Sequence, residues 1–310
     1  MRIVFMGTPH FALPSLKILI DNNYPIVGVV TVPDKPSGRG QEISVPAVKE
    51  FAVQRQLNVL QPDKLKDSSF IDQLSSLNPD LFVVVAFRIL PPEVFRIPKH
   101  GAFNLHASLL PKYRGAAPIN WAIINGEKES GVTTFFLQET VDTGNVILQA
   151  RLPVGEDETA GELHDKLAGV GAEIVLHTVR LIEAGKASPK PQDSATASPA
   201  PKIFKEDCKI DWSKPAHQVH NFIRGLSPRP CAFTFHGKML LKIYGSRIAT
   251  GGKGKQPGEV LGTDRQIVIA TGDGAVGITD LQQEGKRRMS AEEFLRGYRL
   301  HTGDVLGPCQ

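Results

Sequence analysis

The sequence is poor in cysteine, and its three cysteines share no spacing typical of a metal site or a redox motif. Cys208, Cys231 and Cys309 are also odd in number, so we expect no disulfide framework and a reducing, cytoplasmic environment. No cluster of His, Cys and Asp shows metal-ligand spacing either. We therefore predict a protein that works without a metal.

Long hydrophobic runs are also missing. One of the longest, Leu81 to Phe87, is far too short to span a bilayer. The first twenty residues include an early Arg and many apolar residues, but Pro9, His10 and Pro14 interrupt them, and no small-residue cleavage site follows. We expect no membrane partner and interpret this segment as a strand, a turn and a helix.

Glycine is scarce where a dinucleotide site would need it. The segment MGTPHFA, from Met6 to Ala12, stands between a strand and a helix but has one glycine where the phosphate-binding fingerprint has three. An NAD-dependent dehydrogenase is therefore disfavoured.

Charge of either sign is modest, with 36 Lys and Arg against 32 Asp and Glu, but it is unevenly placed. Residues 207–310 hold 15 basic and 10 acidic side chains, a net +5, whereas residues 1–206 hold 21 and 22, a net −1. A basic C-terminal third is typical of a protein that binds a polyanion. A solvated basic surface without a partner would give the same counts.

Short apolar runs alternate with helical periodicity in the first half of the chain. Four runs predict buried strands: Arg2 to Met6, Ile26 to Val32, Leu81 to Phe87 and Gly101 to His106. Apolar residues recur at helical spacing from Phe11 to Ile20 and after Pro46, and Thr159 to Gly185 predicts a long helix. This alternation favours a Rossmann-like α/β domain over residues 1–185, with a mostly parallel sheet and flanking helices.

A change of composition follows that domain. Residues 186–206 are rich in proline and small polar residues, which predicts a linker. Within residues 207–310, a helix is predicted over Ala216 to Gly225, followed by five short strand-like runs separated by Gly, Asp and Lys turns. Strands at this spacing favour a small C-terminal β-barrel of the OB-like type.

Two polar side chains stand at the end of an apolar strand. Asn104 and His106 flank a single residue, so the period of two places them on the same face. Ligands of open α/β sheets bind beyond the carboxyl ends of the strands, where an Asn amide can donate to a carbonyl and a His can exchange a proton. The same two residues could instead satisfy only the backbone of the following loop.

A loop and a turn supply further candidates. The segment SLLPKYRGAAP turns through Pro111 and Gly115, and its Arg114 could pair with an anion or hold the loop in shape. Asp142 lies in a turn with Thr and Gly between two strand-like runs, where its carboxylate could orient His106 or relay a proton. An ordinary turn Asp would fit the same position.

A mostly apolar segment leaves another strand end. The residues VVVAFRILP, from Val83 to Pro91, suit a flat aromatic ligand held against an apolar wall by backbone groups. Continuation of the hydrophobic core is the alternative interpretation.

Together these segments resemble the formyltransferases that use 10-formyltetrahydrofolate, and the resemblance runs over essentially the whole chain. Its most specific part is NLHASLLPKYRGAAP, at Asn104 to Pro118. Six further motifs carry it: GTP at Gly7 to Pro9, PDKPSGRG at Pro33 to Gly40, VDTG at Val141 to Gly144, IDW at Ile210 to Trp212, ATGDG at Ala270 to Gly274, and MSAEEFL at Met289 to Leu295. The segment AFRIL departs from the tRNA-directed members, which usually have Tyr-Gly after the Ala.

The resemblance implies roles for particular residues. The three catalytic positions of the family match Asn104, His106 and Asp142. A pocket for the reduced folate is implied at Phe87, Arg88, Ile89, Leu90, Ser108, Leu109, Leu110, Pro111 and Val141. Contacts with a tRNA acceptor end are implied for Gly38, Arg39, Gly40 and Arg114.

The implied activity is formyl transfer from 10-formyltetrahydrofolate to the α-amine of methionyl initiator tRNA, which supplies N-formylmethionyl-tRNA for translation initiation. Residues 1–185 would be the catalytic domain and residues 207–310 the tRNA-binding domain, in a protein expected to be a monomer. A formyltransferase that acts on glycinamide ribonucleotide or on an amino-sugar nucleotide is the alternative interpretation. A tRNA-binding protein without catalytic activity is a further alternative. The GRG loop and the C-terminal barrel favour tRNA, and the intact catalytic trio favours an enzyme.

Overall fold

The computed structural model describes residues 1–37 and 42–307. It forms two compact units, each built from segments that are separated in the sequence. The first unit contains residues 1–115, 131–152 and 164–199. The second contains residues 116–130, 153–163 and those from 200 onward.

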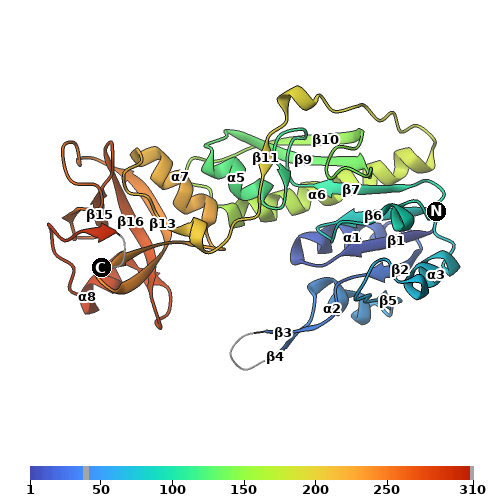
Figure 1. The fold of residues 1–310 in the computed structure, drawn as a ribbon, viewed down its shortest axis with the longest axis horizontal. Helices are drawn as coiled ribbons and strands as arrows, with labels where there is room; N and C mark the ends of the chain where they lie inside the picture. Colours follow the sequence, from blue (N-terminus) through green and yellow to red (C-terminus); the bar gives the residue numbers. More distant parts are fainter. Residues whose placement is uncertain (38–41, 308–310) are drawn as a thin grey trace. The chain divides into compact units, whose positions relative to one another are not determined.

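A seven-stranded sheet forms the centre of the first unit (Figure 1), in the order β10-β9-β7-β6-β1-β2-β5. The strands are β1 (Ile3–Gly7), β2 (Ile26–Val30), β5 (Val59–Leu60), β6 (Leu81–Val85), β7 (Ala102–His106), β9 (Glu129–Phe136) and β10 (Val146–Pro153). Neighbours from β5 to β7 are parallel, and β9 runs antiparallel to β7. The prediction of a mostly parallel sheet is confirmed.

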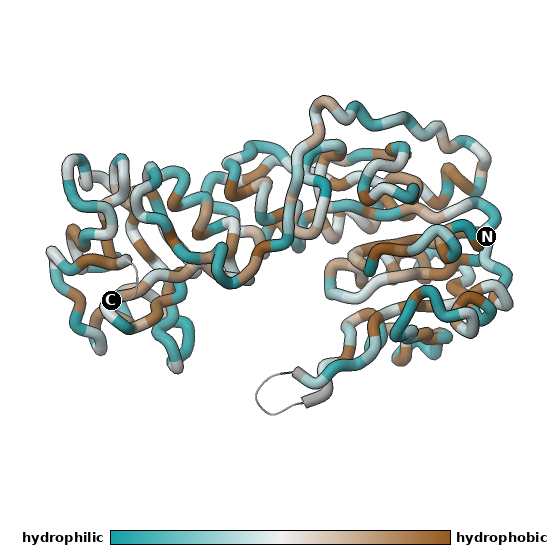
Figure 2. Tube along the Cα trace, viewed as in Figure 1, coloured by the Kyte–Doolittle hydropathy of each residue, from teal (hydrophilic) through white to brown (hydrophobic). Residues whose placement is uncertain are grey.

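Helices cover this sheet through apolar side chains. They are η1 (His10–Ala12), α1 (Leu13–Asp21), α2 (Ala47–Gln54), α3 (Ser68–Ser76), α4 (Pro92–Phe95) and α6 (Ala160–Glu183). Phe70 of α3 and Val94 of α4 belong to one buried cluster with Val84 of β6. Figure 2 shows hydrophobic residues concentrated along the central strands and hydrophilic ones on the outer turns.

Helix α6 packs on the face of β7 that is opposite the candidate site. A Cβ on Gly171 of α6 would lie 2.7 Å from Leu105 Cδ2. Thr178 of α6 also shares a 2.7 Å hydrogen bond with Thr134, which pairs with Leu105 across the sheet. Because side chains alternate along a strand, Asn104 and His106 point away from α6.

The carboxyl ends of three parallel strands meet at one edge of the sheet. Gly7 of β1 pairs with Val85 of β6, and Val85 pairs with Leu105 of β7. The apolar pattern predicts a strand through Phe87, but β6 ends at Val85 because Ala86 adopts a left-handed conformation, with φ 48°. The chain therefore turns at this edge instead of continuing the core.

The second unit is built around a curled antiparallel sheet, in the order β14-β15-β16-β13-β12-β18, with β17 beside β16. The strands are β12 (Ala232–His236), β13 (Met239–Ala249), β14 (Val260–Gly262), β15 (Ile267–Ala270), β16 (Ala275–Gln283), β17 (Met289–Ser290) and β18 (Leu306–Gly307). Hydrogen bonds from Val260 N to Asp304 O and from Leu306 N to Gly258 O, both 2.8 Å, join the two ends of this order. The prediction of a small C-terminal barrel is confirmed.

Three helices accompany this sheet: α5 (Pro118–Ile124), α7 (Ala216–Leu226) and α8 (Ala291–Gly297). Ile223 of α7 and Phe294 of α8 are buried in its core. Trp212 of the IDW motif is buried in the same core, and its indole N–H donates to Thr234 Oγ1 at 3.0 Å. The motif therefore anchors the entry into this unit.

The proline-rich segment is held by specific contacts to other parts of the first unit. We call residues 186–199 the strap. Lys190 and Val146 exchange two 2.8 Å backbone hydrogen bonds, and Arg114 N donates to Ser198 O at 2.9 Å. The strap contains η2 (Ser194–Thr196), and β8 (Arg114–Gly115), β11 (Pro199–Ala200) and η3 (Glu206–Cys208) complete this region. The domain limits given by the composition stay a prediction.

The turn-rich segment after β2 contains a short antiparallel pair, β3 (Lys35–Ser37) with β4 (Glu42–Ser44). None of the helices within the described ranges combines the length and apolar character needed to cross a membrane.

Two glycines of α6 give a matched test of this packing. We expect Gly169→Ala to stabilise the fold by up to about 1 kcal/mol, because its Cβ would meet no atom within 4 Å. Gly171→Ala should destabilise the fold by about 1–3 kcal/mol, because its Cβ would press on buried Leu105. Urea unfolding of both variants measures the difference. Equal effects would show that α6 does not pack on β7 at this point.

Candidate active site

The imidazole of His106 is buried and held by a main-chain carbonyl. Nε2 lies 2.8 Å from Tyr113 O, and 6% of the residue surface is exposed. A carbonyl oxygen can only accept, so Nε2 carries a proton and donates it to Tyr113 O. The other ring nitrogen, Nδ1, faces Asp142 Oδ2 at 3.8 Å.

Asp142 reaches His106 from the turn between β9 and β10. The residue is 8% exposed, and its Oδ2 accepts a 2.9 Å hydrogen bond from Gly115 N. The structure thus brings together two of the three predicted catalytic residues, which are 36 positions apart in the sequence. At 3.8 Å the two groups are in ionic contact range but beyond a direct hydrogen bond.

Asn104 is half-buried two residues before His106 on β7. Its partner across β6 is Val84, and its partner across β9 is Phe135. No side chain or backbone group within the described ranges hydrogen-bonds to its amide. The amide is thus free to donate to a ligand at this strand end.

Three residues with a Cβ adopt left-handed backbone conformations in this region. They are Ala86 after β6, Tyr113 in the loop after β7, and Asp142, with φ values of 48°, 61° and 55°. Such conformations are unfavourable and tend to occur at functional sites. Each lies where the chain must turn sharply to present a group to the strand ends.

The loop after β7 is fixed by hydrogen bonds from neighbouring strands. Thr133 Oγ1 donates to Ser108 O at 2.7 Å and accepts from Leu110 N at 3.1 Å. Gln149 donates to Leu110 O at 2.8 Å, and buried Ser108 donates to Lys112 O at 2.6 Å. Leu109 and Pro111, also predicted to contact the folate, are half-buried in the same loop.

The predicted folate residues after β6 have different environments. Ile89 is 73% exposed, and Leu90 is buried in the core beside α4. Phe87 is half-buried, and Arg88 stacks over its ring at 5.3 Å. Val141, from the turn that carries Asp142, is 46% exposed.

Arg88 occupies the position where the family resemblance leads us to expect a small residue. Its guanidinium donates to Pro62 O at 2.7 Å and to Asp63 O at 2.9 Å. Burial lowers the pKa of Arg88, and Asp63 partly offsets that effect. Arg88 therefore ties the segment after β6 to the loop after β5.

The predicted tRNA contacts divide into two groups. Gly38, Arg39 and Gly40 lie outside the described residues. The Arg114 guanidinium donates to Gln192 Oε1 from Nε at 3.2 Å and from Nη2 at 2.8 Å. The predicted contact between Arg114 and tRNA stays a prediction.

Sequence reasoning missed several groups that hold the site. They are the carbonyl of Tyr113, the N–H of Gly115, the hydroxyl of Thr133 and the amide of Gln192. Two of these are main-chain groups, and the others are ordinary polar residues distant in sequence. No residue type or spacing distinguishes them before the fold is known.

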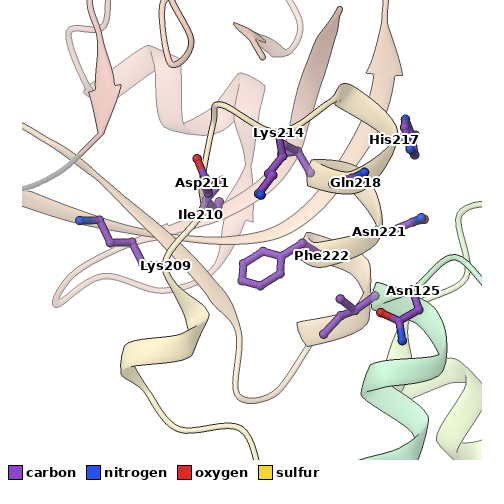
Figure 3. Close-up of a pocket in the computed structure, with 11 residues that line it drawn as sticks. Asn125, Lys209, Ile210, Asp211, Lys214, His217, Gln218, Asn221 and Phe222 are labelled. Atoms are coloured by element: carbon purple, nitrogen blue, oxygen red, sulfur yellow. The ribbon is translucent and has the colours of Figure 1, made fainter. Parts of the chain in front are cut away.

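A cavity of about 610 Å³ lies in the second unit, between α5, α7 and the segment before α7. Lys209, Asp211, Lys214 and Phe222 line it, and in Figure 3 the amine of Lys209 points away from the ring of Phe222. Both lysines are exposed. Two lysines and an aromatic ring that line one cavity are suited to an anionic, ring-containing ligand such as a nucleic acid.

A metal-ligand cluster is not found at the strand ends of the first unit or at the cavity of the second unit, within the part of the chain that the structure describes. Within the described ranges, no group of three or more His, Cys, Asp or Glu side chains could hold a metal ion. The expectation that no metal is needed stays a prediction.

Family comparisons agree with the site geometry. Residues 1–179 match the model of formyl transferase, and residues 202–299 match that of the formyl transferase C-terminal domain. The chain belongs to the formyl transferase family. It is an enzyme of that family, with both of its characteristic domains.

Individual relatives cover the whole chain. The chain is 46% identical over 308 residues to methionyl-tRNA formyltransferase of Caldanaerobacter subterraneus subsp. tengcongensis, covering 99% of this chain and 100% of that protein. Its fold is similar to WlaRD, a sugar 3N-formyl transferase solved with dTDP and 5-N-formyl-THF (TM-score 0.68, 22% identity, 93% and 99% covered). It is also similar to HypX from Aquifex aeolicus in complex with tetrahydrofolic acid (TM-score 0.66, 21% identity), covering 98% of this chain and 50% of that one.

Gly144 offers a test of how closely the Asp142 turn fits its surroundings. A Cβ at Gly144 would lie 1.6 Å from Phe136 O, so Gly144→Ala must displace the turn. We expect formyl transfer to fall roughly 10- to 100-fold, the scale of a misplaced catalytic group. Gly169→Ala is the control and should keep wild-type turnover. Thermal unfolding of both variants separates lost activity from lost folding, and wild-type turnover in folded Gly144→Ala would contradict the geometry.

Proposed function

We propose that this enzyme transfers the formyl group of 10-formyltetrahydrofolate to the α-amine of methionyl initiator tRNA, giving N-formylmethionyl-tRNA. One observation carries the proposal: the buried His106–Asp142 pair, 3.8 Å apart beside Asn104, occurs in a chain 46% identical over its full length to a methionyl-tRNA formyltransferase. Translation initiation would place the reaction in the cytoplasm. The chain is proposed to act as a monomer.

The folate donor supplies an activated formyl group, and the side chains at the strand ends act on it. Asn104 donates a hydrogen bond from its amide to the formyl oxygen as negative charge develops there. His106 donates a second one from Nδ1, because its Nε2–H is committed to Tyr113 O. Nδ1 must therefore be protonated when it acts, which makes the ring a cation.

Asp142 supports that cation and the proton transfer. Its carboxylate oxygen lies 3.8 Å from Nδ1, so a negative charge stands beside the proposed cation. The attacking α-amine, with an ordinary pKa near about 8, is substantially neutral at physiological pH, so attack needs no strong base. The new bond joins the amine to the formyl carbon, the bond from that carbon to folate N10 breaks, and Asp142 helps to move a proton from the amine to N10.

The folate is proposed to lie against Ile89 and Val141. Both are apolar yet exposed, at 73% and 46%, and they come from the segments that follow β6 and precede Asp142. Binding a flat ring would remove their surfaces from water, which is favourable by about 25 cal/mol per Å². Phe87 and Pro111 would extend this wall.

The tRNA is proposed to bind the second unit through its basic cavity. Lys209 and Lys214 line that cavity with Phe222, and residues 207–310 carry a net +5. Phosphates attract such cations, and bases stack on aromatic rings. If glycinamide ribonucleotide were the acceptor, the cavity in the second unit would have no function.

A panel of acceptors tests the proposed function. The enzyme is incubated with 10-formyltetrahydrofolate and methionyl initiator tRNA, glycinamide ribonucleotide or an amino-sugar nucleotide. We expect N-formylmethionyl-tRNA to form at a kcat/KM well above that of the other products. Preferred formylation of either small acceptor would contradict the proposal.

The catalytic roles are tested by three substitutions. Asn104→Ala and His106→Ala should each lower kcat roughly 100-fold or more, the scale of one lost oxyanion donor. Asp142→Asn should be severely impaired and still fold. Steady-state kinetics and circular dichroism provide the measurements. Near-wild-type turnover in the His106 variant would rule out the mechanism.

The basic cavity is tested through the salt dependence of tRNA use. Lys209→Ala and Lys214→Ala should each raise the KM for methionyl-tRNA and reduce the slope of log(kcat/KM) against log[salt] by about 1. Lys238→Ala, at an exposed turn between β12 and β13, is the charge-matched control. Identical slopes in all three variants would exclude the cavity from tRNA binding.

A further inference from the structure

One side chain of the strap connects the two segments that hold the catalytic pair. Gln192 Nε2 donates to Asp142 O at 2.9 Å and to Gly144 O at 2.8 Å. Its Oε1 accepts both hydrogen bonds from the Arg114 guanidinium. We propose that Gln192 is a positioning residue for formyl transfer, which holds the Asp142 turn against the loop that anchors His106. The proposal rests on the role given above to Asp142.

The chemistry of the partners fixes the orientation of the Gln192 amide. The two carbonyl oxygens can only accept and the guanidinium can only donate, so the nitrogen must face the turn and the oxygen must face Arg114. Both N–H groups and both lone pairs of the amide are then used. A half-buried amide whose two N–H donors and two acceptor lone pairs all form hydrogen bonds has one orientation and holds its neighbours at defined distances.

Other contacts also hold the turn, including the 2.9 Å hydrogen bond from Gly115 N to Asp142 Oδ2 and the close packing of Gly144 on Phe136 O. Asp142 has a left-handed backbone, with φ 55°, a conformation that Asp tolerates better than most residues with a Cβ but that still costs free energy. Thr143 Oγ1 bonds locally to Thr140 O at 2.9 Å. Gln192 is the side chain that restrains the carbonyls on both sides of Thr143.

The loop side of the connection leads directly to the catalytic atoms. Arg114 lies between Tyr113, whose carbonyl accepts from His106 Nε2, and Gly115, whose N–H donates to Asp142 Oδ2. Ser198 of the strap holds the same loop, because its hydroxyl accepts from Tyr113 N at 2.9 Å. A shift of the turn relative to this loop would change the 3.8 Å separation of His106 Nδ1 and Asp142 Oδ2.

Two substitutions of Gln192 distinguish a role in attaching the strap to Arg114 from a role in positioning the Asp142 turn. Gln192→Glu keeps acceptors for Arg114 but cannot donate to the carbonyls of Asp142 and Gly144. Gln192→Met keeps a similar length and loses all four hydrogen bonds. If Gln192 served only to attach the strap to Arg114, Gln192→Glu would behave as wild type. Lys190→Ala, an exposed side chain on the same strap, is the matched control.

The variants are compared in the full chain by kcat, KM and thermal unfolding. We expect both Gln192 variants to lower kcat roughly 10- to 100-fold, the scale of a displaced catalytic group, with both KM values within about two-fold of wild type. Lys190→Ala should keep wild-type kinetics. Wild-type kcat in folded Gln192→Glu, or a loss seen only in the KM for tRNA, would overturn the proposal.

A double-mutant cycle tests whether Gln192 acts through Asp142. In the Asp142→Asn background, Gln192→Met should cost less than about three-fold in single-turnover rate, because the group that it positions is already disabled. Full additivity would indicate a general structural role and overturn the proposal. The activity of the wild-type enzyme distinguishes a failure of the proposed function from a failure of the role given to Gln192. An inactive wild type contradicts the proposed function, whereas an active wild type with fully active Gln192 variants contradicts only the role of Gln192.

Discussion

The candidate active site depends on the convergence of parallel strand ends at one edge of the first sheet. The register Gly7–Val85–Leu105 brings the ends of β1, β6 and β7 together. The alternation along β7 then points Asn104 and His106 to the face opposite α6. Everything else at the site is delivered to that edge by loops and turns.

A main-chain hydrogen bond decides which ring nitrogen of His106 could act on a substrate. With Nε2–H committed to Tyr113 O, Nδ1 is the nitrogen that faces Asp142 and is available to a substrate. The left-handed conformation of Tyr113, with φ 61°, directs its carbonyl toward the ring. Backbone conformation after β7 therefore sets which ring nitrogen of His106 is committed to a hydrogen bond.

The strap gives the site a second level of organisation. Ser198 holds the loop that contains Tyr113, and Gln192 holds the turn that contains Asp142. A proline-rich composition is typical of a linker, but here the residues between the prolines make the specific contacts. The strap is therefore part of the structure of the site as well as a connection.

Local patterns predicted much of the fold, whereas the catalytic roles of Asn104, His106 and Asp142 come from the family resemblance and stay a prediction. The buried runs at β1, β6 and β7 and the helical periodicity of α6 are visible in the sequence because burial imposes a period on apolar residues. The positive φ of Ala86, which ends β6 early, leaves no periodic pattern of apolar residues in the sequence. Nor do the bonds of Gln192 to Arg114 and Asp142, which join residues 78 and 50 positions apart. Contacts of this kind depend on tertiary structure and leave no periodic trace.

The most direct measurement of the central claim is the protonation of the His106 ring by ¹⁵N NMR in the uniformly labelled enzyme. The structure predicts a proton on Nε2, with a through-bond correlation to the carbonyl carbon of Tyr113, both in the resting enzyme and with the folate bound. A ring protonated only at Nδ1 would contradict the account, because Nε2 could not then donate to Tyr113 and the orientation toward Asp142 would have another cause.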